Sequence, residues 1–321
     1  MNFSQRLLFL TLFICSQSLH AQGRSDAIFK IIPLGVKGGT DESNLSSYMV
    51  ALEGTSDFIC LDAGTLHFGL QQAVKNGLLT GDPVAILRTK VKAFVISHPH
   101  LDHVSGLILN SPDDSSKNIY ALPFCIDVLK NNYFTWQNWA NFADAGDKPF
   151  LGKYHYVFLD TTKETAIENT KMFVQPFVLS HAKPNKSTAF LIRYQDAYLL
   201  YLGDTGADAT ENVNNLYLLW KTIVPLINTK KLKAIFVETS FPDEQPTGQL
   251  FGHLTPTLLM KELKVLGSLT GNALLKDFPV VITHIKPGSG NAEEKIKKQL
   301  EKLNSLEVKL IFAEQAKMLQ F

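Results

Sequence analysis

Four potential metal ligands lie within six consecutive positions of this chain, directly after a short apolar run that reads as a β-strand. They are His98, His100, Asp102 and His103, in the motif SHPHLDHVSG. Imidazole and carboxylate groups are ligands that Zn²⁺ and similar borderline metals prefer. Four such groups at this spacing cannot all reach one ion comfortably. We therefore expect His98 and His100 to hold one metal and the other two side chains to turn toward a second.

Three further polar residues each end an apolar, strand-like run much later in the chain. His181 ends FVQPFVLSH, Asp204 ends AYLLYLGD, and His284 ends FPVVITH. Taken singly, each of the three is as easily explained without a metal: the two histidines as residues at the edge of a core, and the aspartate as a turn residue. Because the arrangement of strand and then ligand recurs, we expect all three to join the motif at the carboxyl ends of their strands, where sites form.

Short apolar runs rich in Val, Ile, Phe and Tyr recur along the chain and predict β-strands. They cover residues 28–36, 48–52, 58–61, 93–96, 173–179, 190–194, 198–202, 234–237 and 280–282. Helical patterns lie between them, and no internal repeat or long linker divides the sequence. We therefore expect an α/β fold, with layers of helices around sheets, in a single domain over residues 22–321.

Two helices near the C-terminus have recognisable start signals. Thr255 and Pro256 look like an N-cap and a first helical residue, with Gly267 as the stop. Asn291 and Glu294 resemble a capping pair at the start of a second, amphipathic helix.

Residues 133–153, YFTWQNWANFADAGDKPFLGK, interrupt this pattern with six aromatic side chains among polar ones. The segment predicts a helix that packs on the body of the protein by its aromatic face. The alternative interpretation is a cap that stacks the planar ring of a substrate.

Residues 1–21 predict a signal peptide. Arg6 supplies a positive start, an apolar run extends from Leu7 to Cys15, and Ala21 suits the last position before cleavage. The run is shorter than the roughly 20 apolar residues that a membrane-spanning helix needs. An anchoring or buried N-terminal helix is the alternative. We expect an exported protein, periplasmic or secreted, without a stable membrane span.

Charge and cysteine content narrow the classes of partner. The chain has 31 basic and 30 acidic residues, and loss of residues 1–21, which contain Arg6 and no acid, leaves no formal net charge. Without a basic surplus, we expect no nucleic-acid partner. Cys60 and Cys125 remain after cleavage. They could pair in an oxidising compartment, although two buried thiols are favoured.

The order of these motifs resembles the metallo-β-lactamase fold, an αββα sandwich with a two-metal site between its sheets. The resemblance covers nearly the whole chain after residue 21 and begins at LDAGT, where Asp62 matches the strand-end aspartate that supports the metal loop. The H-x-H-x-D-H motif, His181, Asp204 and His284 follow in the order of the fold's motifs. The fold alone implies only a metal-dependent hydrolase.

A narrower resemblance is to the class II 3′,5′-cyclic-nucleotide phosphodiesterases. HPHLDHVSGLILNSP, from residue 98 to residue 112, matches their signature, and its first leucine and its terminal Asn-Ser-Pro are the discriminating parts. ETSFPDEQ, GHLTP and THIKP match later pieces in order. The resemblance implies hydrolysis of cyclic AMP, cyclic GMP or both to nucleoside 5′-monophosphates. The attacking group would be a hydroxide that bridges two divalent metal ions, which are expected to be Zn²⁺.

The resemblance also implies a role for each ligand. The first metal would be held by His98, His100 and His181, the second by Asp102, His103 and His284, and Asp204 would bridge the two. Asp102 is expected to belong to both the ligands and the catalytic residues.

A separate pair matches the proton donor of phosphodiesterases of this fold. His253 is the expected general acid for the leaving 3′ oxygen, and Glu238 would orient its ring and favour the protonated form. A histidine that merely bonds to backbone before a helix is the alternative for His253. Thr239 and Ser240 are weaker candidates, as donors to the substrate phosphate.

Rival functions share the fold. A tRNA 3′-end nuclease or another phosphodiesterase would use the same metal set, but RNA is an awkward substrate for an exported chain without positive charge. An exported lactonase or β-lactamase would not need Glu238 and His253. A catalytically silent nucleotide-binding protein would have lost metal ligands, and none of the seven expected ligands is missing. We expect a small cyclic nucleotide as the partner and leave the oligomeric state open.

Overall fold

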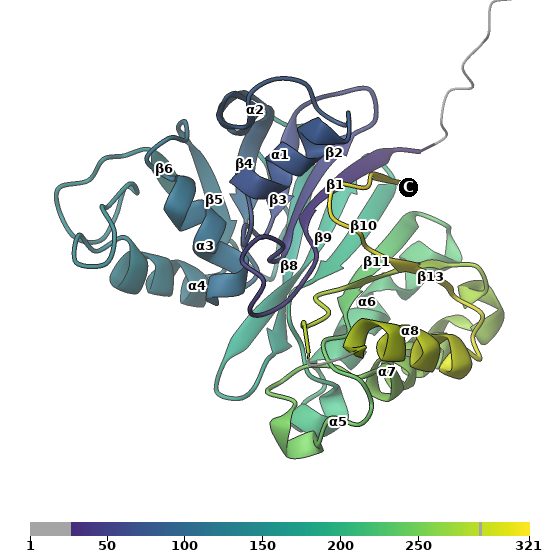
Figure 1. The fold of residues 1–321 in the computed structure, drawn as a ribbon. Helices are drawn as coiled ribbons and strands as arrows, with labels where there is room; N and C mark the ends of the chain where they lie inside the picture. The colour runs from purple at the N-terminus through teal and green to yellow at the C-terminus, as the bar shows by residue number, and fades with distance from the viewer. Residues whose placement is uncertain (1–26, 289–290) are drawn as a thin grey trace, which may run out of the picture.

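Two seven-stranded sheets pack face to face in the computed structural model, which describes residues 27–288 and 291–321 (Figure 1). The strands of the first sheet are, in spatial order, β14 (Leu319–Gln320), β1 (Phe29–Gly35), β2 (Ser47–Leu52), β3 (Phe58–Leu61), β4 (Val91–Val95), β5 (Lys117–Ala121) and β6 (Tyr154–Phe158). Those of the second sheet are β13 (Lys309–Phe312), β12 (Pro279–Thr283), β11 (Leu232–Glu238), β10 (Ala197–Leu202), β9 (Lys186–Tyr194), β8 (Phe173–Ser180) and β7 (Thr165–Ala166). The predicted signal peptide lies outside the described residues.

Helices cover the outer face of each sheet, so the layers follow the order αββα (Figure 1). The first sheet is covered by α1 (His67–Lys75), α2 (Pro83–Lys90), α3 (Leu101–Asn110) and α4 (Pro123–Val128), which continues into the π-helix η1 (Leu129–Tyr133). The second sheet is covered by α6 (Asn215–Asn228), α7 (Pro256–Thr270) and α8 (Ala292–Leu303). The short elements are α5 (Asp208–Glu211), η2 (Thr247–Gln249) and η3 (Asn272–Leu275). Within residues 27–288 and 291–321, every helix is too short or too polar to cross a bilayer.

Three apolar layers hold the sandwich together, one between the sheets and one under each set of helices. In β1, Ile31 packs between the sheets and Ile32 packs under the helices. In β10, Tyr201 packs between the sheets and Leu202 packs under the helices. Because such strands are buried on both faces, their sequences are continuous apolar runs.

Parallel pairing brings the polar residues at several strand ends to one edge. In the first sheet β3 pairs in parallel with β4, and in the second β10, β11 and β12 pair in parallel. The carboxyl ends of parallel strands meet at the same edge, where α/β sheets bind ligands. Asp62, Asp204, Glu238 and His284 lie at such ends or within two residues after them.

The strand predictions agree with the structure, since each of the nine predicted runs overlaps a strand. No run in the sequence predicts β5, β6, β7, β13 or β14. These strands are short or mix polar residues into the run, as Lys117 and Asn118 do in β5. The tertiary environment therefore decides their conformation.

Two details of the helix predictions are wrong. α7 begins as expected, and the Thr255 side chain accepts a hydrogen bond from the backbone N–H of Leu258. However, the helix continues through Gly267 and ends before Gly271, whose φ of 91° suits a glycine. A glycine inside a helix costs only about 1 kcal/mol, so packing can override it. α8 follows Asn291, but the Asn291 side chain makes no capping hydrogen bond.

The helix predicted over residues 133–153 is also wrong, because residues 134–153 are irregular. Phe134 is buried, and Trp139 and Phe142 pack against the core under the first helical layer. Most of the aromatic side chains, with Tyr133 among them, therefore pack on the body as expected, whereas Trp136 and Phe150 are exposed. Gly146 adopts a φ of 100° and Pro149 lacks a backbone N–H, and both features oppose a helix here.

Cys60 and Cys125 are both buried and unpaired, which agrees with the favoured interpretation of two thiols. Burial raises the pKa of Cys60 to about 12 and raises that of Cys125 well above its ordinary value. Both groups therefore stay protonated at neutral pH, which makes them poor nucleophiles.

Candidate metal centre

The H-x-H-x-D-H motif occupies the turn between β4 and α3. Pairing with β3 carries the end of β4 to the sheet edge, and the chain then turns into a helix at Leu101. His100 is at the N-cap position of α3, and Asp102 and His103 lie in its first turn. The change from extended chain to helix within the motif is what allows its two halves to face different neighbours.

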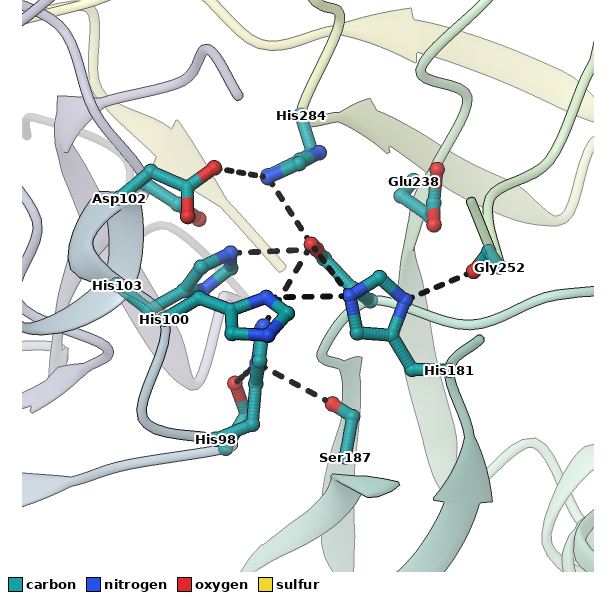
Figure 2. A network of polar contacts seen from close by, with 12 residues as sticks. His98, His100, Asp102, His103, His181, Ser187, Glu238, Gly252 and His284 are labelled. Atoms are coloured by element: carbon teal, nitrogen blue, oxygen red, sulfur yellow. Dashed lines mark hydrogen bonds and ion pairs between the residues drawn. The ribbon is translucent and has the colours of Figure 1, made fainter. Parts of the chain in front are cut away.

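The first cluster consists of His98, His100, His181 and Asp204, whose ligand atoms lie within 4.8 Å of one another. The Nε2 atoms of His98 and His181 are 3.7 and 3.8 Å from Oδ2 of Asp204. Nε2 of His181 is also 3.3 Å from Nδ1 of His100 (Figure 2). Nitrogen ligands about 2.0–2.1 Å from a Zn²⁺ ion would be spaced in this way. The cluster can therefore hold one cation.

The second cluster consists of Asp102, His103, Asp204 and His284, again within 4.8 Å of one another. Nε2 of His284 lies 3.2 Å from Oδ2 of Asp102 and 3.2 Å from Oδ2 of Asp204. Nε2 of His103 lies 3.3 Å from the other oxygen, Oδ1, of Asp204. Asp204 belongs to both clusters, which is the position that a bridging ligand requires.

The protonation states in the first cluster suit metal binding. The buried Nε2 atoms of His98 and His103 have no hydrogen-bond partner among the described residues. Burial and the neighbouring imidazoles lower the pKa of His98 well below its ordinary value and that of His100 to about 4. Burial raises the pKa of Asp204, but the nearby His284 and His103 lower it by a larger amount. The net pKa lies well below its ordinary value, so the carboxyl is ionised. Neutral imidazole and ionised carboxylate are the forms that bind metals. In the second cluster, burial lowers the pKa of His103 but the Asp204 and Asp62 carboxylates raise it by more, so a cation would displace a proton there.

Asp62 supports the motif from the end of β3. Its Oδ1 accepts a hydrogen bond from the backbone N–H of Ser97 at 2.7 Å. Its Oδ2 lies 2.8 Å from Nδ1 of His103 and accepts from the Tyr201 hydroxyl at 2.6 Å. The bond to Nδ1 leaves Nε2 of His103 free to face the second cluster, which is how outer carboxylates orient metal-binding histidines. This contact agrees with the supporting role expected for Asp62.

His253 and Glu238 form a pair beside the two clusters. Nδ1 of His253 lies 2.8 Å from Oε1 of Glu238, and both side chains are buried. Burial lowers the pKa of His253, but the Glu238 carboxylate beside it raises the pKa by a larger amount. The net pKa therefore lies above its ordinary value. His253 Nδ1 is 3.8 Å from Oδ2 of Asp204, which places the pair next to the shared ligand.

The hydroxyl groups of Thr239 and Ser240 do not face the site as donors to a phosphate. Both residues are buried, and the Thr239 hydroxyl donates to the backbone carbonyl of Glu238. The Ser240 hydroxyl donates to the Glu238 carboxylate and lies 3.0 Å from Nδ1 of His284. Ser240 therefore links the His253–Glu238 pair to the second cluster, a role that the sequence did not reveal.

A glycine pair between β1 and β2 also contacts the second cluster. The backbone N–H of Gly39 donates to Oδ2 of Asp102 at 2.8 Å. A Cβ atom on Gly38 would collide with the His284 ring. The Gly-Gly pair after an apolar run was the available signal, since glycine often marks a close approach of the backbone to another group.

The structure brings together all seven expected ligands, and their roles as ligands stay a prediction. An αββα sandwich with two His/Asp clusters at its sheet edge defines the metallo-β-lactamase class of fold. The chain belongs to a narrower family within it, because a family model described as "cAMP phosphodiesterases class-II" matches residues 83–312. A 3′,5′-cyclic-nucleotide phosphodiesterase of Aliivibrio fischeri is 39% identical over 97% of this chain and 98% of its own length.

Solved structures agree on the architecture. The unliganded yeast PDE1 structure superposes with a TM-score of 0.81 at 23% identity, over 92% of this chain and 100% of that chain. The metallo-β-lactamase fold protein YhfI from Bacillus subtilis has a TM-score of 0.60 at 15% identity, over 91% of this chain and 99% of that chain. These similarities confirm the fold that the sequence predicted.

Proposed function

We propose that this chain hydrolyses 3′,5′-cyclic nucleotides to nucleoside 5′-monophosphates at a site for two divalent cations. The observation that carries the proposal is the His253–Glu238 pair, whose 2.8 Å contact adjoins the two four-residue clusters. The pair forms a third, smaller group of potential ligands with His284. Such a pair is needed where an alkoxide must be protonated as it leaves. Membership of the class-II family supports a cyclic nucleotide as the substrate.

The donor set supports two cations, and we propose Zn²⁺ for both. Seven side chains with one shared carboxylate are too many for a single tetrahedral ion. Five of the seven are imidazoles, which favour Zn²⁺ over Mg²⁺ or Ca²⁺. When bound, the two cations would lower the pKa of water so that hydroxide is available at neutral pH, and would neutralise charge on the phosphoryl oxygens.

The proton for the leaving group would come from His253. Opening the cyclic phosphate breaks the bond from phosphorus to the 3′ oxygen, and that oxygen departs with a negative charge. Glu238 holds Nδ1 of His253, which leaves Nε2 to deliver a proton to the 3′ oxygen. Glu238 itself accepts hydrogen bonds from backbone N–H groups, among them that of Thr205 at 3.0 Å. These bonds hold the carboxylate that orients the His253 ring.

We also propose that the protein is exported after removal of residues 1–21. The support is the short apolar run that follows Arg6 in the sequence, because it has the length of the apolar part of a signal peptide. N-terminal sequencing of the native protein is expected to begin near residue 22. A native N-terminus at Met1 would contradict export by this route.

The catalytic proposal is tested by incubating the metal-loaded protein with cyclic AMP and cyclic GMP and identifying products chromatographically. We expect a nucleoside 5′-monophosphate, and no 3′-monophosphate. Parallel reactions with lactones, β-lactams and other phosphodiesters cover the rival hydrolases. Tight binding of cyclic AMP without any 5′-AMP would instead identify a silent binding protein and overturn the proposal.

A further inference from the structure

A pocket of about 440 Å³ opens directly beside the first metal cluster. Its lining residues are Pro99, His100, Phe124, Val128, Tyr133 and residues 184–186. The volume lies in the range of small-molecule sites, roughly 300–1,000 Å³. His100 is the exposed member of the first cluster, so the pocket and the candidate metal centre share a wall.

The π-helix η1 brings an aromatic ring to this pocket. Phe124 and Val128 are four residues apart on α4, which places them on one helix face. A continued α-helix would add Asn132 to that face. Instead, the backbone N–H of Phe134 bonds to the carbonyl of Leu129, five residues earlier, at 2.9 Å. The wider turn substitutes Tyr133 for Asn132 in the pocket wall, and such π-turns often occur at functional sites.

The Tyr133 ring is fixed in place by the metal-binding motif itself. Its hydroxyl donates to the backbone carbonyl of Pro99 at 3.0 Å, and Pro99 lies between His98 and His100. This bond satisfies the polar end of the side chain. The aromatic ring remains half-buried as part of the pocket wall.

We propose that this pocket holds the nucleobase of the substrate, stacked on the rings of Tyr133 and Phe124. This inference rests on the proposed function and assigns it a specificity subsite. A base is flat and apolar on its faces, and stacking on aromatic side chains tolerates any base. The exposed amide of Asn185 at the pocket wall can both donate to and accept from a base edge. A base held here leaves the cyclic phosphate next to His100.

The proposal is tested with Tyr133→Ala and with Val128→Trp, which fills the pocket without removing core volume. We expect KM for cyclic AMP to rise about tenfold in each, as for the loss of one stacked base, with little change in kcat. Hydrolysis of bis(p-nitrophenyl) phosphate, which has no base, is expected to stay unchanged. Tyr133→Phe keeps the ring and is expected to restore KM. The matched control is Phe150→Ala, which removes an exposed aromatic side chain outside the pocket.

Binding of products separates this inference from the proposed function. By calorimetry, the wild-type protein is expected to bind 5′-AMP more tightly than ribose 5-phosphate, and Tyr133→Ala is expected to abolish the difference. Absence of cyclic AMP hydrolysis in the wild type would overturn the proposed function, while this binding difference would still support the subsite. Equal binding of the two ligands, or variants that slow both substrates alike, would overturn the subsite.

Discussion

A Cβ atom added to Gly38 would lie 2.1 Å from Cε1 of His284, far inside van der Waals contact. The two residues are distant in the sequence, and they meet because the loop after β1 passes the end of β12. His284 also has a positive φ of 57°, which is uncommon for a residue with a side chain. The backbone at Gly38 is therefore part of the wall that sets the position of the His284 ring.

Gly38→Ala is expected to displace His284 and to weaken the second metal site. The protein should retain about one metal per chain and lose at least ~10-fold in activity, the lower end of the effects seen when groups around a metal are disturbed. Elemental analysis of the purified variant, with a thermal melt to confirm folding, checks this. Gly248→Ala is the matched control, because a Cβ there would meet nothing within 4 Å. Full metal content in Gly38→Ala would contradict this prediction, because it would show that the His284 ring can move without loss of a metal.

Asp204→Asn is expected to lose metal as well as rate. The substitution keeps the volume of the side chain but removes the charge shared by both clusters. We expect two metals per wild-type chain and one or none in the variant, with activity reduced by more than ~10²-fold. The charge control is Asp196→Asn, on an exposed carboxylate paired with Lys231. One tightly held metal in a fully active wild-type protein would refute the two-metal site.

His253→Ala is expected to retain both metals but to hydrolyse cyclic AMP ~10²–10⁴-fold more slowly, the usual cost of losing a general acid. The defect should be much smaller with bis(p-nitrophenyl) phosphate, because nitrophenolate departs without a proton. Glu238→Gln should show the same pattern more mildly, since the acid is still present. Comparison of kcat/KM for the two substrates, together with metal content, provides the test. Loss of a metal in His253→Ala, or equal defects with both substrates, would identify His253 as a ligand or a phosphate binder.

Lys117→Met is expected to lower the free energy of unfolding by about 3–5 kcal/mol, because it leaves the buried Asp114 carboxylate without its cation. Nζ of Lys117 lies 2.7 Å from Oδ1 of Asp114, and the two side chains are 2% and 0% exposed. Urea unfolding measures the change. Adding Asp114→Asn should restore part of the stability, since the amide can still accept from the Tyr154 hydroxyl that now bonds to Asp114 at 2.8 Å.

The control for this pair is Lys92→Met, which breaks a surface contact of 3.3 Å with Asp57. Exposed ion pairs contribute only about 0–1 kcal/mol, so this variant should unfold almost like the wild type. Similar losses in the Lys92 and Lys117 variants would mean that burial of the Lys117 pair has no particular importance for stability.

The sequence by itself indicated the candidate ligands and determined most of the strands. A strand buried on both faces must be apolar along its length, so a run such as FPVVITH shows both the strand and the polar residue that ends it. The H-x-H-x-D-H spacing likewise predicts two half-sites without any structure. These are local properties of the chain. The strands were predicted correctly, and the roles of the ligands stay a prediction.

Only the tertiary structure decided which distant groups touch. The approach of Gly38 to His284, the hydrogen bond from Ser240 to Glu238 and the π-turn that exposes Tyr133 to the pocket leave no periodic trace in the sequence. The irregular path of residues 134–153, read as a helix from its aromatic spacing, belongs with them. Each of these features depends on how the sheets and loops pack against one another, and the free energy of that packing outweighs the local preference of a few residues.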